Sequence, residues 1–209
     1  MVDVHAHRFQ ALLYRWRWKI TAFVLGGASA FAAIGLGALA VVQFGLYDTS
    51  AAKPHYALVS WAAHATFTQS TRRRSQGIEA PSSFTPAQVQ AGAQEYVGDC
   101  MMCHGGPGVA RARWVRGLTP SPPYLLDDAH LWSKPELFWI IQRGAKMSAM
   151  PAWGETRSDA QIWNLVAFLE ALPGLSPADF RKMQPAATAP GVAEGVSPKG
   201  GHPKYLNTR

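Results

Sequence analysis

Cys100 and Cys103 stand three residues apart, and His104 follows at once in the sequence Cys100-Met101-Met102-Cys103-His104. Two thiols one helical turn apart can each add to a vinyl group of one porphyrin, and the next residue then presents an imidazole to the iron. This spacing is the attachment signature of c-type haem. It predicts one covalently bound haem c, with thioethers to Cys100 and Cys103 and with His104 on the iron.

Other uses of a cysteine pair fit this chain less well. Cys100 and Cys103 are the only cysteines among its 209 residues. A structural zinc site takes four nitrogen or sulfur ligands, commonly from two cysteine pairs. A redox dithiol would be expected near a βαβ pattern, which the sequence does not show. Haem attachment is therefore the favoured interpretation.

The positive charge of the chain lies on its flanks. The formal net charge is +7, to which residues 1–84 contribute 8 basic and 3 acidic groups and residues 185–209 contribute 3 and 1. Residues 85–184 carry 9 of each and are neutral. A nucleic-acid-binding domain would carry a basic stripe on its folded part. No nucleic-acid partner is predicted.

The N-terminal part of the chain has the pattern of a membrane anchor. Residues 1–19 mix basic residues with Tyr14, Trp16 and Trp18, and residues 20–47 form a run of 28 without a charge. About 20 apolar residues suffice to span a bilayer, and basic and aromatic residues gather at its edge. The pattern predicts a single transmembrane helix over residues 20–47, with residues 1–19 in the cytoplasm. A cleavable signal peptide is the rival interpretation, but its apolar region would be limited to about 15 residues.

Residues 48–84 read as a connector. Pro54 favours the start of a helix that runs to about Gln76, with Leu58, Trp61, Ala62 and Ala65 on one face. Such a helix could lie on a membrane surface or a partner, with Arg72 to Arg74 at its basic end. A solvated spacer is the alternative.

Residues 85–184 are predicted to be an all-α domain. Thr85, Ser133 and Ser158 each begin a capping box with Gln or Glu three residues on, so each is expected to start a helix. Between the first two helices, residues 109–132 are expected to be irregular, because three prolines disfavour regular structure. Residues 185–209 are rich in Pro, Gly and Ala and are expected to form an extended tail.

This order of elements resembles the class I c-type cytochromes, especially the single-haem modules of respiratory oxidases and dehydrogenases. The resemblance covers about residues 85–175, and the matching residues are Gly92 and Tyr96, the Cys100–His104 motif, Met150-Pro151-Ala152-Trp153, and Ile162-Trp163 through Leu169. It implies a fold in which the first and last helices of the domain cross beside the haem.

The resemblance also implies an axial ligand pair of His104 and Met150. A thioether is a soft ligand that favours ferrous iron, and Pro151 fixes the backbone directly after Met150. Met147 and His130 remain alternatives as the second ligand.

Further contacts follow from the same family. A proline carbonyl is expected on the ring N–H of the proximal histidine, and Tyr96 and Trp153 are candidates for packing on the haem or behind its ligands. The sequence leaves the proline carbonyl open among Pro120, Pro122 and Pro123.

The resemblance implies electron transfer and not catalysis. The expected protein is a membrane-anchored carrier in a bacterial inner (cytoplasmic) membrane, with its haem domain in the periplasm, where the family attaches haem. Its expected partners are redox proteins and a larger membrane complex such as a terminal oxidase or a dehydrogenase. A haem enzyme, or a gas or redox sensor with a displaceable distal Met, is the alternative.

Overall fold

The computed structural model describes residues 4–184, with side chains from Tyr14 onward. Its contacts divide the chain into two units, Met1–Lys53 and Pro54–Arg209, which are described separately. The predicted tail of residues 185–209 lies outside the described residues.

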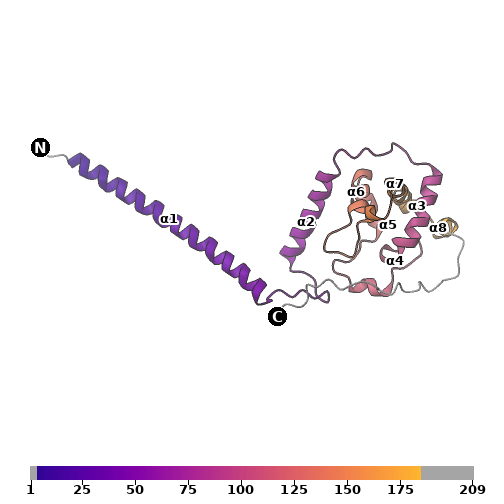
Figure 1. Cartoon of the computed structure of the whole chain (residues 1–209), viewed down its shortest axis with the longest axis horizontal. Coiled ribbons are helices and arrows are strands. Elements are labelled where there is room, and N and C mark those ends of the chain that lie inside the picture. The colour runs from indigo at the N-terminus through magenta and orange to yellow at the C-terminus, as the bar shows by residue number, and fades with distance from the viewer. Residues whose placement is uncertain (1–3, 185–209) are drawn as a thin grey trace. The chain divides into compact units, whose positions relative to one another are not determined.

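The prediction of an all-α protein is confirmed, since residues 4–184 contain helices and no β-strand. Figure 1 shows the course of the chain. The helices and 3₁₀ turns are α1 (Val4–Gln43), α2 (Ala57–Arg74), α3 (Pro86–Asp99), α4 (Met101–His104), η1 (Arg113–Gly117), α5 (Leu125–Asp128), η2 (Ala129–Leu131), α6 (Lys134–Arg143), η3 (Trp153–Glu155), α7 (Asp159–Ala171), η4 (Leu172–Gly174) and α8 (Pro177–Met183).

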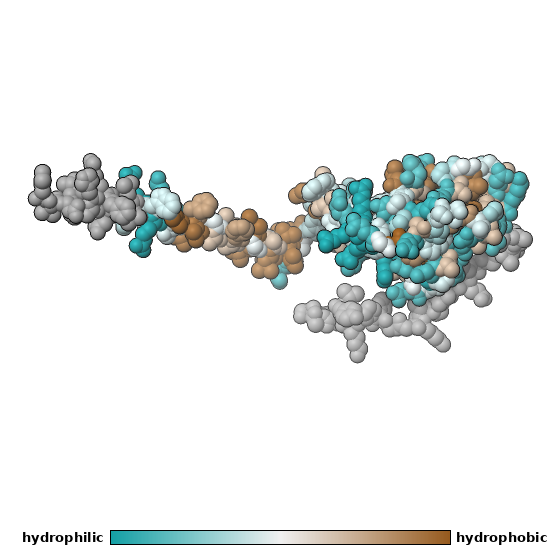
Figure 2. All heavy atoms as spheres, turned by 90° about the horizontal axis from the view of Figure 1, so that it is seen from above, coloured by the Kyte–Doolittle hydropathy of each residue, from teal (hydrophilic) through white to brown (hydrophobic). Residues whose placement is uncertain are grey.

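The first unit consists mainly of α1, whose segment Tyr14–Gln43 is long and apolar enough to cross a membrane. Large apolar side chains along it, such as Phe23 and Phe31, are 83% and 79% exposed. In Figure 2 these residues form a brown band next to a teal basic segment. The helix ends at Gln43, four residues before the predicted end of the span.

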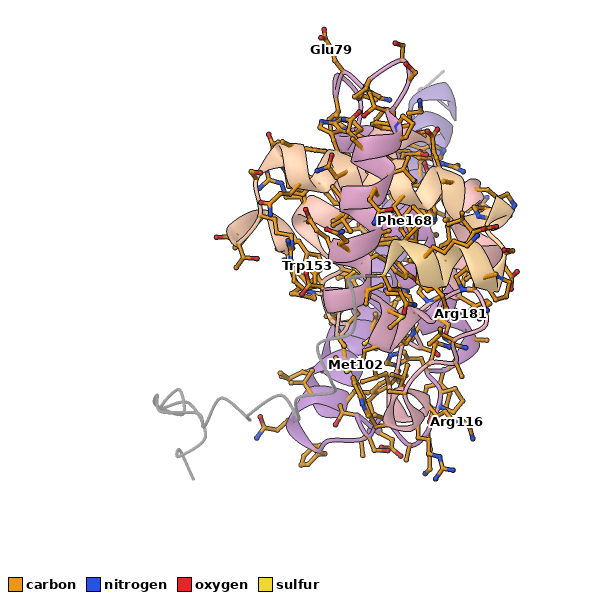
Figure 3. The ribbon with its side chains drawn as sticks, turned by 90° about the vertical axis from the view of Figure 1, so that its right-hand side faces the viewer. Glu79, Met102, Arg116, Trp153, Phe168 and Arg181 are labelled. Carbon is orange, nitrogen blue, oxygen red and sulfur yellow. The ribbon has the colours of Figure 1, made fainter. Side chains whose placement is uncertain are left out.

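The second unit is built on the packing of α3 against α7. Gly92 lies at the point of contact, where a Cβ atom would come within 1.9 Å of the Asn164 carbonyl oxygen. Glycine therefore lets the two backbones approach more closely than any other residue would. Around this point the fully buried side chains of both helices form the core: Ala93, Tyr96, Ile162, Leu165 and Phe168. Figure 3 labels Phe168 among the packed helices.

All three predicted capping boxes are present. Thr85, Ser133 and Ser158 stand at the N-caps of α3, α6 and α7, and in each case the residue three positions on bonds back to the cap. These reciprocal bonds satisfy backbone donors that a helix start leaves unpaired. They explain why the sequence located these helix starts so closely.

The C-terminal half of the connector helix α2 packs against the rest of the second unit. The rings of Phe67 and Trp132 pack in a T-shaped arrangement, with 5.9 Å between their centroids. Arg72 lies 3.9 Å from Glu136 of α6, and Thr71 is fully buried. The face predicted from Leu58 and Trp61 is exposed, because those residues lie in the turns that precede the contact.

Two parts of the domain differ from expectation. Residues 109–132, expected to be irregular, contain the short helical turns η1, α5 and η2. The short helix α8 was not predicted, although Ser176, Pro177 and Asp179 form a local start signal in which Ser176 caps the helix. Its Phe180 is fully buried and stacks on Phe168 at 5.9 Å.

Replacing Gly92 by Ala should destabilise the domain by at least about 2 kcal/mol, because the new methyl group overlaps the backbone of α7. Urea unfolding followed by circular dichroism measures this change. Gly98→Ala is the matched control, since Gly98 lies on the same helix with nothing within 4 Å of its Cβ position. The control should be neutral or slightly stabilising, and equal effects of both substitutions would contradict the close crossing.

Candidate functional site

The two cysteines lie on a single helical turn that continues α3. Cys100 is the C-cap of α3 and the N-cap of α4. The Cys103 and His104 amides donate to the Cys100 carbonyl at 3.1 and 2.9 Å. The two thiols are therefore one helical turn apart and the imidazole follows directly, as the attachment motif requires. Burial, with a smaller contribution from Asp99, raises the pKa of the Cys100 thiol to about 12.

The orientation of His104 is fixed by the backbone of the proline segment. Its Nδ1 lies 2.9 Å from the carbonyl oxygen of Pro123. A carbonyl only accepts hydrogen bonds, so Nδ1 carries the proton and the lone pair of Nε2 remains available to a metal.

The structure thus brings Pro123 to His104, and not Pro120 or Pro122. The Pro122 carbonyl instead accepts a hydrogen bond from Arg111 at 2.6 Å. Burial, and to a lesser degree the Arg111 cation, lowers the pKa of His104 below its ordinary value. Both effects favour the neutral imidazole, which is the form that binds metals.

Tyr96 supports the attachment turn from within the core. Its ring is 1% exposed and lies 4.9 Å from the Phe168 ring centroid. Its hydroxyl donates to the carbonyl of Gly105, directly after His104, at 2.7 Å. Burial raises the pKa of Tyr96 above its ordinary value, so the phenol stays protonated and remains a donor. The contact therefore ties the residue after His104 to α3.

The loop that carries Met150 is held by short-range backbone bonds. The Ala145 amide donates to the Met150 carbonyl at 3.2 Å, and the Met150 amide donates to the Ser148 hydroxyl at 3.1 Å. Gly144 has a φ of +66° and closes α6, and a Cβ atom there would lie 2.7 Å from the Met150 carbonyl oxygen. Glycine is thus required both for the turn and for this close approach.

The possible distal ligands differ in their surroundings. Met150 is half-buried and packs against the hydrophobic core. Met147 is 87% exposed, and its backbone has a φ of +61°. His130 is exposed on η2. Of these three side chains, only Met150 is packed against the interior of the domain.

Trp153 also packs against the core, and Arg157 covers its ring, with Cζ 5.6 Å from the ring centroid. Sequence reasoning did not single out Arg157. It bonds to Glu95 at 2.9 Å and also to Asp99, both on α3. The i, i+4 spacing of these two acids on the helix that leads into Cys100 was the available signal.

The side chains present fit a covalently attached haem. The site offers two thiols on one turn, an imidazole whose Nε2 is left available, and an inward-packed thioether. Among the described residues, no three His, Cys, Asp or Glu side chains gather into another candidate metal site. A His/Met pair is an established axial set for haem iron in cytochromes c.

Comparison with known proteins agrees with this geometry. Residues 87–169 match the family described as cytochrome C oxidase, cbb3-type, subunit III. Over 102 residues the chain is 30% identical to the quinohemoprotein alcohol dehydrogenase of Comamonas testosteroni. That match spans 49% of this chain and 13% of the dehydrogenase.

Replacing Tyr96 by Phe should cost about 1–3 kcal/mol of unfolding free energy, because it leaves the Gly105 carbonyl without its buried donor. Urea unfolding of the haem-loaded protein measures the loss. Tyr124→Phe is the control, since its hydroxyl makes a longer bond of 3.4 Å to Gly106 in a partly exposed position. A Tyr124→Phe loss as large as that of Tyr96→Phe would show that burial does not set the strength of these bonds.

Proposed function

This chain carries a class I c-type cytochrome domain that binds one haem c covalently, and from that premise we propose that it is a membrane-anchored carrier of single electrons. Haem c supplies the one-electron chemistry at its iron. The residues of the chain would hold the group and orient its ligands.

We assign the thioethers to Cys100 and Cys103 and the axial positions to His104 and Met150. The observation that carries this proposal is the contact of His104 Nδ1 with the Pro123 carbonyl, at 2.9 Å. A metal-bound histidine is held in this manner by a hydrogen bond to its second nitrogen. The packing of Met150 against the core supports its role on the other side of the iron.

A haem iron held by both His104 and Met150 would have no open position. Such a site exchanges electrons without binding a substrate. This supports a role as an electron-transfer domain, either of an independent carrier or of a larger oxidoreductase. A haem enzyme or sensor would instead release Met150 to admit a ligand.

Haem linkage and the distal ligand are tested together by spectroscopy. The haem should stay with the protein in acid–acetone, and Cys100→Ala with Cys103→Ala should abolish attachment. Met150→Ala should remove the weak red absorbance of the ferric iron–sulfur bond and allow the ferrous protein to bind carbon monoxide. Met147→Ala is the control and should change neither property, since Met147 is exposed. The reverse result would move the ligand to Met147, and a wild-type protein that binds carbon monoxide freely would favour the sensor or enzyme.

We further propose that α1 anchors the chain in a bacterial inner (cytoplasmic) membrane with the haem domain in the periplasm. The exposed apolar segment Tyr14–Gln43 is long enough to span a bilayer. Trp16 and Trp18, interleaved with basic residues, mark its N-terminal edge. Positive charge at this edge favours a cytoplasmic N-terminus.

If α1 is a membrane anchor, the protein should fractionate with membranes. The full chain should remain in membranes through an alkaline carbonate wash and should enter solution only with detergent. A cysteine-accessibility assay should label a new cysteine at Ser50 from the periplasm and one at Gln10 only after the membrane is opened. Release by carbonate, or labelling in the opposite sense, would contradict the anchor or its orientation.

A redox partner is expected to meet the surface beside the attachment turn. Arg111, Arg113 and Arg116 follow the attachment turn and precede the next acids, Asp127 and Asp128, although residues 85–184 as a whole are neutral. Trp114 and Met102 are 54% and 52% exposed, and the Ala112 amide bonds to the Met102 carbonyl at 3.0 Å. Figure 3 shows Met102 and Arg116 toward the same end of the domain. Complementary charge would favour an acidic partner surface, in a larger membrane complex such as an oxidase or dehydrogenase.

A further inference from the structure

We propose that Arg157 is a positioning residue for the distal ligand, because it joins the chain segment that carries Met150 to the helix that carries Cys100. The proposal rests on the assignment of Met150 as the distal ligand. It concerns the charged cluster formed by Glu95, Asp99 and Arg157. The haem-attachment motif does not require this cluster.

The acidic half of the cluster lies on the last turns of α3. Glu95 and Asp99 are four residues apart, so both carboxylates face the same side of the helix. Their side chains are only 17% and 26% exposed. Burial raises the pKa of Glu95 above its ordinary value, although the Arg157 guanidinium acts in the opposite direction. A cation shared between the two carboxylates offsets their mutual repulsion.

Arg157 supplies that cation from the turn between η3 and α7. One guanidinium nitrogen donates to Glu95 at 2.9 Å and the other donates to Asp99. The side chain is 20% exposed. A planar guanidinium can bridge two carboxylates through separate N–H groups, which a lysine ammonium does not reproduce. Asp99 directly precedes Cys100, so this bridge ends at the attachment turn.

The same guanidinium also covers Trp153, three residues after Met150. Arg157 Cζ lies 5.6 Å from the Trp153 ring centroid, and the Arg157 amide donates to the Trp153 carbonyl at 2.8 Å. Trp153, labelled in Figure 3, packs in turn against the core. Backbone and side chain of Arg157 thus hold the end of the Met150 segment at a fixed place beside α3.

The cluster differs from an ordinary ion pair in what it connects. Lys134 provides the comparison, because it has a similar exposure of 24%, an ion pair with Glu170 at 3.4 Å, and a ring contact with Phe84 at 4.9 Å. Its hydrogen bonds go to the Pro81 and Ser82 carbonyls, in the segment before α3. Lys134 therefore offers a cation with a comparable exposure, an ion pair and a ring contact, but without a direct link to the Met150 segment.

The test compares Arg157→Gln with Lys134→Gln in the haem-loaded full chain. The probe is imidazole, added to the ferric protein as a competitor for the distal position and followed by loss of the red iron–sulfur absorbance. Arg157→Gln should raise the apparent affinity for imidazole at least tenfold. Lys134→Gln should leave the affinity for imidazole within twofold of the wild-type value, even if it lowers the melting temperature of the protein as much as Arg157→Gln does. Arg157→Lys should restore part of the wild-type resistance, because it keeps the charge but not the bridge.

Amide hydrogen exchange provides a second measurement that does not depend on the ligand assignment. Arg157→Gln should speed exchange at residues 145–157, and Lys134→Gln should not. If Arg157→Gln fails to fold, Glu95→Gln is measured in its place and should shift both readouts in the same direction. Unchanged imidazole affinity in a folded Arg157 variant overturns the proposal, whether or not exchange rises. A wild-type protein without the red absorbance refutes Met150 ligation instead, and in that case the exchange data alone decide whether Arg157 holds the loop.

Discussion

The contact between Gly92 of α3 and the Asn164 backbone of α7 is the constraint on which the rest of the domain depends. It brings together the two helices that supply most of the buried core. α3 leads directly into the attachment turn, and α7 begins directly after the segment that follows Met150. A larger residue at position 92 would separate these helices and, with them, the two sides of the haem site. The absence of a side chain at Gly92 therefore sets the distance between α3 and α7, and with it the spacing of the site residues that follow and precede these helices.

Around this crossing, the site is positioned largely by backbone carbonyls. The Pro123 carbonyl orients His104, the Gly105 carbonyl is held by Tyr96, and the Met150 carbonyl closes a turn with Ala145. Carbonyl groups do not titrate, so these contacts keep their strength over a wide range of pH. Arg111 affects the pKa of His104, and Glu95 and Asp99 are both paired with Arg157.

The sequence predicted those features whose signals are local. A capping box and an attachment motif each occupy a few consecutive residues, the apolar run is one continuous segment, and the three helix starts agree with the structure. The choice of Pro123 over its neighbours depends on how the segment folds back toward His104, which no short pattern encodes. The burial of Phe180 in α8 and the bridge from Arg157 to α3 likewise depend on tertiary packing between distant segments.

The packing of α2 has a practical consequence for producing the domain without its anchor. Composition would suggest cutting the chain before Thr85, where the haem domain was expected to begin. Such a cut would remove Phe67 from the edge of Trp132 and Arg72 from Glu136. It would expose the Trp132 ring to water and promote aggregation. A water-soluble version should instead start near Pro54, where the second unit begins. The helix α2 would then remain packed against the rest of the domain.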